Sequence, residues 1–331
     1  MIVLGIETSC DDTSAAVFDG RDLCSNVVST QLVHRNFGGV VPELASRSHV
    51  RLVLPVIRQA LEQAEVPKSQ LGGVAATYGP GLAGSLLVGL TAAKAISLSL
   101  SIPFIGVNHL EGHLWANFLA HPGLEPPFVV LIASGGHTQL VHVRDRSDYA
   151  VMGRTRDDAA GEAFDKVGKL LGLGFPGGPV IEKNARDGNP RAVAFPRARL
   201  EEQSLDFSFS GLKTAVLNHV QTIGEDETVR TLPDITASFQ QAAVDSLVQK
   251  AVAAASRAKV RSVCLAGGVA VNRALQACMR EKAGREGMNV FFPPPALCSD
   301  NAGMIAAAGH YYLNRQIVSP MTLAPSPSLN L

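Results

Sequence analysis

The chain has 331 residues, which is enough for one large domain or two medium ones. Hydrophobic residues make up 46% and charged residues 18%, so the composition excludes a disordered chain and allows a substantial core. The 29 basic and 29 acidic residues cancel. Any contact with nucleic acid must therefore use a local basic patch rather than the field of the whole protein.

Cysteine usage and hydrophobicity bear on where the protein works. The five cysteines are scattered and include no CxxC pair, so neither a disulfide framework nor a zinc ribbon is predicted, and a reducing cytosol fits best. The N-terminal MIVLGIETSCDD lacks a basic start and reaches acidic residues too early for a signal peptide. The longest apolar run, SLLVGLTAAKAISLSLSIPF, is broken by Lys94 and ends at Pro103. We therefore predict a cytoplasmic protein with no membrane span.

The first half of the chain alternates predicted strands and helices. Short apolar runs rich in β-branched residues predict strands at residues 2–7, 15–18, 72–78 and 102–107. Helical spacing predicts a helix at 44–66, and a run of small and apolar residues predicts another at 85–100. The last strand leads into NHLEGHLWANFLA, which we expect to be a helix that begins near Asn108.

The second half of the chain opens with the same design as the first. Residues 127–145 read as an apolar strand, a tight Ser-Gly-Gly turn and a second strand. A long helix is predicted at 234–258, a strand with a glycine turn at 260–268, and a helix at 269–287. The repetition suggests two related α/β halves. We expect the Pro-rich end of the chain to be loose or docked on the surface.

Several glycine-rich turns are candidate phosphate sites. GPGLAG at 79–84 fits the dinucleotide-binding pattern, but no acidic residue follows about 20 positions on, so we interpret it as a turn that needs tight helix packing. The turns ASGG (133–136), GFPGGP (174–179) and LAGGVAVN (265–272) can bind anions through backbone amides. With the polar TSCDDTS (8–14) and GEAFDK (161–166), they predict a phosphate cleft between two lobes.

Two histidines on the predicted helix after residue 108 suggest a metal site. His109 and His113 lie four residues apart, so their imidazoles share one helix face. With Glu111 the segment superficially matches the H-E-x-x-H box of zinc peptidases. Glu111 is one position too far along and points to nearly the opposite side of the helix, and Gly112 weakens the helix. Peptidase activity is therefore not predicted.

A metal site needs a third ligand, because two histidines on a polar helix face are common without a metal. Asp300, at the start of a predicted small-residue helix, is the first candidate, and Cys298 is the second. Two histidines and an aspartate with open positions suit iron, zinc or manganese, and they leave room for a substrate oxygen.

Seven segments in order, from about residue 2 to 312, carry a resemblance to a known family. They are GIETSCDDTSAAV, NHLEGH, ASGGHT, DDAAGEAFDKVGKLLGLGFPGGP, DFSFSGLKTAV, LAGGVAVN and CSDNAGMIAA. The chain resembles the bacterial tRNA N6-adenosine threonylcarbamoyltransferases, a universal family once described as O-sialoglycoprotein endopeptidases. Family members often carry two adjacent histidines where this chain has Asn108 and His109. Glu182 stands where related chains carry varied polar or acidic residues.

The resemblance implies an α/β protein with two actin-like (RNase H-like) lobes of the sugar kinase and Hsp70 ATPase superfamily. Each lobe would be a mixed sheet flanked by helices, with the nucleotide cleft between the lobes. We expect an N-terminal lobe at 1–125, a C-terminal lobe at 126–312 and a tail at 313–331. The resemblance also implies one divalent metal ion, iron or alternatively zinc, on His109, His113 and Asp300. The implied substrate-binding residues are Ile132, Ala133, Ser134, Gly135, Gly136, Asp165, Gly178 and Asn272.

The implied reaction moves the threonylcarbamoyl group of threonylcarbamoyl-adenylate to the N6 amine of the adenosine 3′ of the anticodon, in tRNAs that read ANN codons, and releases AMP. The cleft would hold the adenylate substrate or ATP. The implied partners are tRNA, a smaller catalytically inactive paralogue that forms a heterodimer, and a P-loop ATPase. The stretch 183–199 carries five basic residues and only one acid, and we expect Arg197 and Arg199 to contact tRNA.

Two further functions stay open from the residues themselves. An ATPase or sugar-kinase-like phosphotransferase of the same fold would act on a small hydroxyl acceptor, but it gives the two histidines and Asp300 no task. A non-catalytic binding module should lack these metal ligands altogether.

Overall fold

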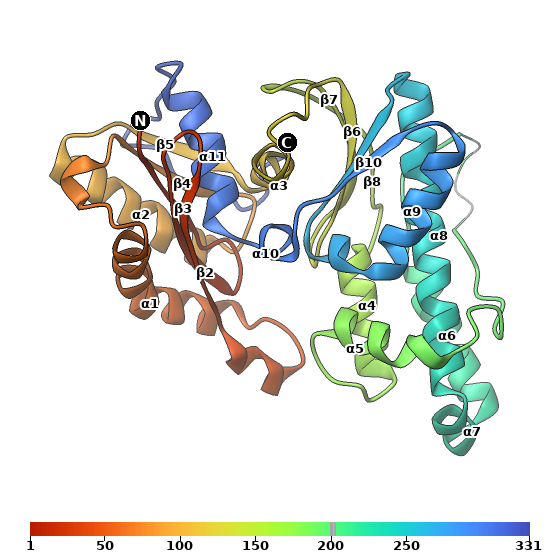
Figure 1. The fold of residues 1–331 in the computed structure, drawn as a ribbon. Helices are drawn as coiled ribbons and strands as arrows, with labels where there is room; N and C mark the ends of the chain where they lie inside the picture. Colours follow the sequence, from red (N-terminus) through yellow and green to blue (C-terminus); the bar gives the residue numbers. More distant parts are fainter. Residues whose placement is uncertain (199–200, 202) are drawn as a thin grey trace. The chain divides into compact units, whose positions relative to one another are not determined.

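The structure is a computed structural model that describes residues 1–198, 201 and 203–331, and it separates into two compact units. Unit 1 comprises Met1–Pro122 and Ser299–Leu331, and unit 2 comprises Gly123–Cys298. Each unit is an α/β structure built on its own five-stranded sheet, as Figure 1 shows.

The sheet of unit 1 has the strand order β3-β2-β1-β4-β5. Its strands are β1 (Val3–Glu7), β2 (Asp12–Phe18), β3 (Leu23–Thr30), β4 (Gly73–Gly79) and β5 (Phe104–Asn108). The first three strands form an antiparallel meander, and β4 and β5 continue the sheet parallel to β1. Every residue of β1 is buried, as its continuous apolar run predicts for a central strand.

Helices cover both faces of this sheet (Figure 1). They are α1 (Pro42–Gln63), α2 (Ala83–Leu100), α3 (His109–Ala120) and α11 (Ala302–Leu313), with short 3₁₀ turns at Leu32–Phe37 and Lys68–Gln70. α1 and α2 contact each other and the sheet, and α11 lies against β1, β2, β4 and β5. A Cβ added at Gly5 of β1 would overlap the carbonyl oxygen of Ala302, and one added at Gly309 would overlap Ala75. The small residues of α11 therefore let its backbone lie directly on the strands.

The boundary between the units differs from the one expected from sequence. Residues 299–312 were assigned to the C-terminal lobe, but they belong to unit 1, because α11 packs on the unit 1 sheet. The tail belongs there too and is docked rather than loose. The Ser319 amide donates to the Phe104 carbonyl (2.8 Å), the Ser326 amide to the Tyr78 carbonyl (2.7 Å), and the Asn108 side chain to the Asn330 carbonyl (2.9 Å).

The sheet of unit 2 repeats the design of unit 1. Its strands are β6 (Phe128–Ala133), β7 (Thr138–Asp145), β8 (Asp148–Arg154), β9 (Ser262–Ala266) and β10 (Asn289–Phe291), in the order β10-β9-β6-β7-β8. β6, β7 and β8 form the antiparallel meander, while β9 and β10 run parallel to β6. The two sheets thus share one topology, which confirms the prediction of two related halves.

Unit 2 carries a larger set of helices. They are α4 (Ala160–Leu170), α5 (Gly177–Asn184), α6 (Ser210–Ile223), α7 (Glu225–Arg230), α8 (Leu232–Ala258), α9 (Arg273–Arg285) and α10 (Pro295–Cys298), with 3₁₀ turns at Ala185–Asp187 and Gly268–Val271. The long helix α8 runs through the core, where Phe239 meets Phe164 with ring centroids 5.1 Å apart. The predicted helix at 234–258 is confirmed to within two residues.

One helix in the described part of the chain, α2, is long and apolar enough to cross a membrane by length and composition, with a mean hydropathy of 1.5. Helices in the cores of water-soluble proteins pass the same test. In this structure α2 packs against β4 and α1 and buries Leu86, Gly89 and Leu90 among others.

The GPGLAG turn that leads into α2 is confirmed as a packing turn. A Cβ at Gly79 would overlap the carbonyl of Ser326, one at Gly81 would lie 2.6 Å from the carbonyl oxygen of Ser9, and one at Gly84 would overlap Ser46. Each glycine lies against the chain's own atoms, so the pattern is explained without a bound dinucleotide.

Candidate functional site

The two predicted histidines lie on the first two turns of α3. The helix begins at His109, and the side-chain oxygen of Asn108 caps it by accepting the Leu110 amide at 2.9 Å. His109 and His113 are both buried, and their ring centroids are 4.8 Å apart. The cap and the one-turn spacing fix both imidazoles on one side of the helix.

Asp300 comes from the second chain segment of unit 1 and contacts both histidines. It immediately precedes Asn301, the N-cap of α11. Its Oδ1 lies 3.5 Å from Nε2 of His109 and 3.3 Å from Nε2 of His113. One ligand atom from each of the three side chains lies within 4.8 Å of the others, and this is the group of potential metal ligands found among the described residues.

His113 provides the test of whether this group fits a metal. Its side chain is fully buried, and neither ring nitrogen makes a hydrogen bond within the described part of the chain. A buried imidazole without hydrogen bonds costs free energy unless another partner satisfies it. Two imidazole nitrogens and one carboxylate are also a donor set that suits iron or zinc. The residues present therefore fit a divalent metal ion.

Glu7 contacts the ring nitrogen of His109 that faces away from Asp300, and the sequence did not point to it. This fully buried carboxylate ends β1, and its Oε2 lies 3.0 Å from Nδ1 of His109. The Ser9 amide (2.5 Å) and the Thr77 hydroxyl (2.6 Å) donate to the same carboxylate. A carboxylate on the far nitrogen of a ligand histidine fixes the ring and leaves Nε2 for the metal. The signal that could have found Glu7 is an acidic residue at the end of a wholly apolar strand.

The electrostatics of this cluster follow from burial and opposite charge. Burial alone would lower the pKa of His109, but the carboxylates of Asp300 and Glu7 raise it to about 9. Burial would raise the pKa of Glu7, but the imidazolium of His109 brings it below its usual value. Without a metal, the buried pair is therefore an imidazolium and a carboxylate.

Asp12, the first residue of β2, is a second acid that the sequence analysis did not single out. Burial, with smaller contributions from Asp300, Asp11 and Glu7, raises its pKa to about 7 against a weaker opposing hydrogen bond from Thr30. Its Oδ1 is buried and has no hydrogen-bond partner within the described residues. Asp12, Glu7 and Asp300 thus act on one another electrostatically at this end of the sheet.

The residues that suggested a peptidase have other partners. Glu111 is buried and its carboxylate accepts a hydrogen bond from the Tyr312 hydroxyl on α11. A Cβ at Gly112 would lie 2.7 Å from Ile305, so this glycine serves the contact between α3 and α11. The second-choice ligand Cys298 donates to the Pro293 carbonyl instead, and burial raises the pKa of its thiol to about 11.

In unit 2, two of the three predicted glycine turns, 133–136 and 265–272, lie at the carboxyl ends of β6 and β9, which are parallel neighbours, and the third, 174–179, leads into α5. Ile132 and Ala133 end β6 and are buried, and the turn after them is closed by the Ser134 amide donating to the His137 carbonyl at 2.8 Å. Gly135 and Gly136 are exposed, and a Cβ added to either would meet no described atom within 4 Å. Gly267 follows β9 with a φ of +86°, and a Cβ there would overlap the Ala133 carbonyl.

Asp165 and Gly178 lie where α4 and α5 meet. Oδ1 of Asp165 accepts the amide of Gly177, the first residue of α5, at 2.7 Å. A Cβ at Gly177 would overlap the Phe164 carbonyl, whereas one at Gly178 would meet no described atom within 4 Å. The first of these glycines is therefore needed for packing, and the second leaves the helix N-terminus open.

Asn272 and Glu182 hold the start of α9. Oδ1 of Asn272 caps the helix by accepting the Leu275 amide, and its Nδ2 donates to Gln240 at 2.7 Å. Oε1 of Glu182 accepts the Arg273 amide at 3.1 Å. A carboxylate at a helix N-terminus is stabilising, which gives Glu182 a structural role.

Of the two arginines expected to contact tRNA, Arg197 is described and Arg199 lies outside the described residues. The guanidinium of Arg197 donates to the Asp245 carboxylate at 2.7 Å and to the Phe195 carbonyl at 2.7 Å. It is therefore paired within the protein, although its side chain is still 39% exposed.

The family model of the tRNA N6-adenosine threonylcarbamoyltransferases matches residues 22–307. The chain belongs to this family. Relatives of that name include the protein of Desulfitobacterium hafniense, which is 52% identical with 99% of this chain and 97% of the relative covered. The Symbiobacterium thermophilum protein is 52% identical with 100% and 97% covered, and the Moorella thermoacetica protein is 51% identical with 99% and 97% covered.

Solved structures show the fold that these threonylcarbamoyltransferases share with other proteins. Full-length HypF in its phosphate- and nucleotide-bound form matches with a TM-score of 0.65 at 14% identity, over 96% of this chain and 56% of HypF. Component A of (R)-2-hydroxyglutaryl-CoA dehydratase from Acidaminococcus fermentans matches with a TM-score of 0.58 at 15% identity, over 95% and 98% of the two chains. At such identities the likeness concerns the fold alone, and it agrees with the expected actin-like lobes.

Proposed function

We propose that the chain transfers the threonylcarbamoyl group of threonylcarbamoyl-adenylate to the N6 amine of the adenosine 3′ of the anticodon, in tRNAs that read ANN codons, with release of AMP. The observation that carries this proposal is the match to threonylcarbamoyltransferases at 52% identity over almost the whole chain. A sugar kinase or ATPase of the same fold gives no task to the His109, His113 and Asp300 group.

The reaction demands positioning more than covalent catalysis. The mixed anhydride of the donor is already activated, whereas the adenine N6 amine is a poor nucleophile because its lone pair is delocalised into the ring. The enzyme must therefore hold amine and carbonyl together and stabilise charge on the carbonyl and the leaving phosphate.

Iron, with zinc as the alternative, would be held by His109, His113 and Asp300, and when bound it would supply Lewis-acid polarisation of a phosphate or carbamoyl oxygen. The protein's own part is to orient the ligands. Glu7 and Ser9 contact Nδ1 of His109 at 3.0 and 3.2 Å and fix its ring. The absence of hydrogen bonds on both nitrogens of His113 among the described residues supports a ligand role for it.

The glycine turns of unit 2 would bind the adenylate. Gly135 and Gly136 are exposed and have space where side chains would stand, so backbone amides of this turn can approach an oxyanion. Gly178, on the open first turn of α5, would face the substrate in the same way. We assign Asp165 to positioning rather than to proton transfer, because its Oδ1 already accepts the Gly177 amide. Asn272, whose side chain caps α9, would contact substrate from that cap.

The proposed partners are tRNA, a smaller inactive paralogue and a P-loop ATPase, and the proposed compartment is the cytoplasm. Support for the paralogue comes from α1 and α2, which contact each other and expose Val50, Leu54, Leu87 and Leu98 at half or more of their surface. Exposed apolar side chains on two adjacent helices are suited to packing against helices of a related chain.

The test is an assay of modified nucleosides. The full chain and its two protein partners are incubated with threonine, bicarbonate, ATP, the adenylate-forming enzyme and an unmodified tRNA that reads ANN codons. Digestion and mass spectrometry should detect N6-threonylcarbamoyladenosine. Phosphorylation of a small hydroxyl acceptor with no modified adenosine would favour the kinase alternative and contradict the proposal.

A further inference from the structure

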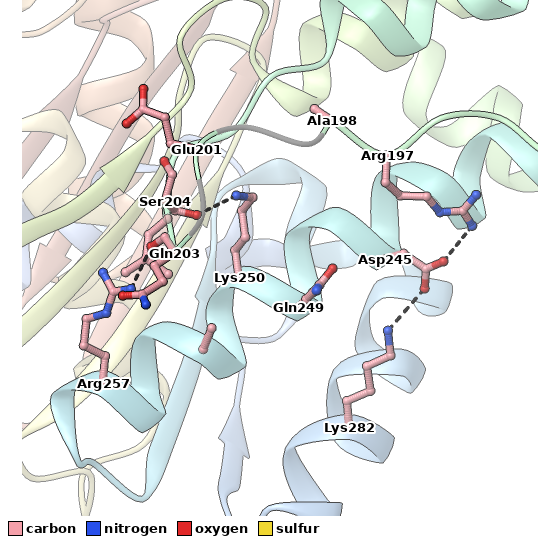
Figure 2. A pocket seen from close by; sticks show the side chains of 12 residues that line it. Arg197, Ala198, Glu201, Gln203, Ser204, Asp245, Gln249, Lys250, Arg257 and Lys282 are labelled. Atoms are coloured by element: carbon pink, nitrogen blue, oxygen red, sulfur yellow. Dashed lines mark hydrogen bonds and ion pairs between the residues drawn. The ribbon is translucent and has the colours of Figure 1, made fainter.

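A pocket in unit 2 is lined by residues outside the glycine turns and has no role in the chemistry above. Its volume is about 1070 Å3, and its described walls come from α8, α9 and residues 197, 198, 201 and 203–205. The described lining residues are Arg197, Ala198, Glu201, Gln203, Ser204, Leu205, Asp245, Gln249, Lys250, Ala253, Arg257 and Lys282. Figure 2 shows these side chains around the hollow.

Positive charge exceeds negative charge in this lining. Arg197, Lys250, Arg257 and Lys282 face only Glu201 and Asp245 among the described lining residues, which leaves a net charge of +2. The whole chain has no net charge, so the excess is a local feature of the kind that nucleic-acid binding requires here.

The cations divide into two groups by their partners. Asp245 accepts from Arg197 at 2.7 Å and from Lys282 at 3.3 Å, so one carboxylate serves two cations. Lys250 donates to the Ser204 carbonyl at 2.8 Å, and Arg257 donates to the Gln203 carbonyl at 2.7 Å (Figure 2). A carbonyl satisfies hydrogen bonds but does not neutralise charge.

The pairing of Arg197 and Lys282 with Asp245 is what an ordinary solvated surface shows. The carbonyl partners of Lys250 and Arg257 are not explained in that way. Lys250 is only part-exposed, and burial lowers the pKa of its ammonium group, with Arg156 adding repulsion and Asp206 partly opposing it. A partly buried cation whose hydrogen-bond acceptor is a carbonyl rather than a carboxylate gains from an incoming anion.

Lys250 and Arg257 also have the spacing for an extended anion. Both lie on α8, seven residues apart, which is about 10 Å along the helix axis and close to the same face. Two charges at that separation would meet different phosphates of one strand rather than a single phosphate. The described lining contains no aromatic side chain on which a base could stack.

We propose that this pocket binds backbone phosphates of the RNA substrate through Lys250 and Arg257. The proposal rests on the proposed function, since that function makes tRNA the substrate. Contacts of this type position an RNA without reading its sequence. They differ from the expected contacts of Arg197 and Arg199, because Lys250 and Arg257 lie on α8 and donate to carbonyls, whereas Arg197 is paired with the Asp245 carboxylate.

The test compares the full chain with a Lys250→Gln/Arg257→Gln double variant in binding an unmodified tRNA transcript across a salt series. Loss of two phosphate contacts should weaken binding by roughly tenfold at physiological salt and reduce the slope of log K against log salt by about 1.5. The matched control is Arg230→Gln, an exposed cation of unit 2 on α7 that pairs with Glu227 outside the pocket. It should change neither quantity.

Unchanged affinity and unchanged slope in the double variant would overturn the proposal. A thermal melt checks folding, and if the double variant does not fold, the single variant Arg257→Gln replaces it, with an expected slope reduction of roughly 0.8. Inorganic phosphate separates the two sources of anion. If phosphate stabilises the wild type but not the variant while tRNA binding is equal, the pocket is a free-anion site and the RNA proposal is wrong.

The nucleoside assay separates this proposal from the proposed function. If the wild-type chain modifies tRNA and the double variant binds tRNA like wild type, only the pocket proposal fails. If the wild-type chain does not modify tRNA, the proposed function itself fails, whatever the pocket binds.

Discussion

Units 1 and 2 have the same strand order, yet they use the turn between their first two strands in opposite ways. In unit 1 the end of β1 and the start of the turn after it carry buried polar side chains, and Glu7 and Ser9 reach Nδ1 of His109. In unit 2 the turn after β6 presents Gly135 and Gly136, which are exposed and have no side chains. The link between the first two strands therefore positions a histidine side chain in unit 1, whereas in unit 2 it exposes backbone amides.

The largest effect is expected from the ligand group of unit 1. His113→Ala removes an imidazole whose nitrogens have no hydrogen bond among the described residues, so it should abolish metal binding and lower transfer by roughly 100-fold or more. Metal analysis of the purified chain and the nucleoside assay measure both. His121→Ala, at the end of the same helix, is the matched control and should retain metal. Full transfer by a metal-free His113→Ala chain would remove the metal from the account.

Glu7→Gln tests whether the end of β1 in unit 1 acts through His109. The amide keeps the size of the side chain but loses the charge that fixes the His109 ring, so metal affinity should fall by about 10- to 100-fold. Competition with a chelator measures the affinity. Equal metal affinity in the variant and the wild type would mean that the end of β1 does not orient the ligand.

A pair of glycine variants tests the unit 2 turn. Gly267→Ala places a side chain at a φ of +86° against the Ala133 carbonyl, so it should destabilise the fold by ~3 kcal/mol in urea unfolding. Gly136→Ala meets no described atom, so stability should change by less than about 0.5 kcal/mol while KM for the donor rises roughly tenfold. An unchanged KM for Gly136→Ala would show that this turn does not contact the substrate.

The raised pKa of Asp12 predicts how the stability of the folded chain depends on pH. An aspartate whose pKa is raised to about 7 holds its proton more tightly in the folded state than in the unfolded state, where the value is 3.8. It therefore costs stability as pH rises from about 4 to about 7, and that loss is complete above pH 7. Asp12→Asn should stabilise the metal-free chain by ~2 kcal/mol at pH 8 and have little effect at pH 4. Equal effects at both pH values would contradict the raised pKa.

Much of the fold could be predicted from the sequence because its central strands and long helices are strongly patterned. β1, β4, β5 and β6 are short apolar runs, and α1, α2 and α8 have clear helical spacing or length. The strands β3, LCSNVVST, and β8, DYAVMGR, were missed because they are edge strands with polar, part-exposed residues. Their pairing depends on a neighbouring strand rather than on their own pattern.

The candidate site could be predicted only in part for a similar reason. His109 and His113 can be recognised by their helical spacing, and Asp300 by its place before a helix. Glu7 and Asp12 come from strands far away in sequence, so their contacts depend on the sheet register, which no local pattern encodes. The assignment of α11 to unit 1 likewise depends on Gly5 and Gly309, whose importance appears only when the helix is seen on the sheet.

The most direct test of the account is the nucleoside analysis of an ANN-reading tRNA after incubation with the full chain, its partners and the donor-forming system, run beside His113→Ala. The account predicts N6-threonylcarbamoyladenosine next to the anticodon with the wild-type chain and almost none with the variant. Unmodified adenosine with a folded, metal-loaded wild-type chain would contradict it.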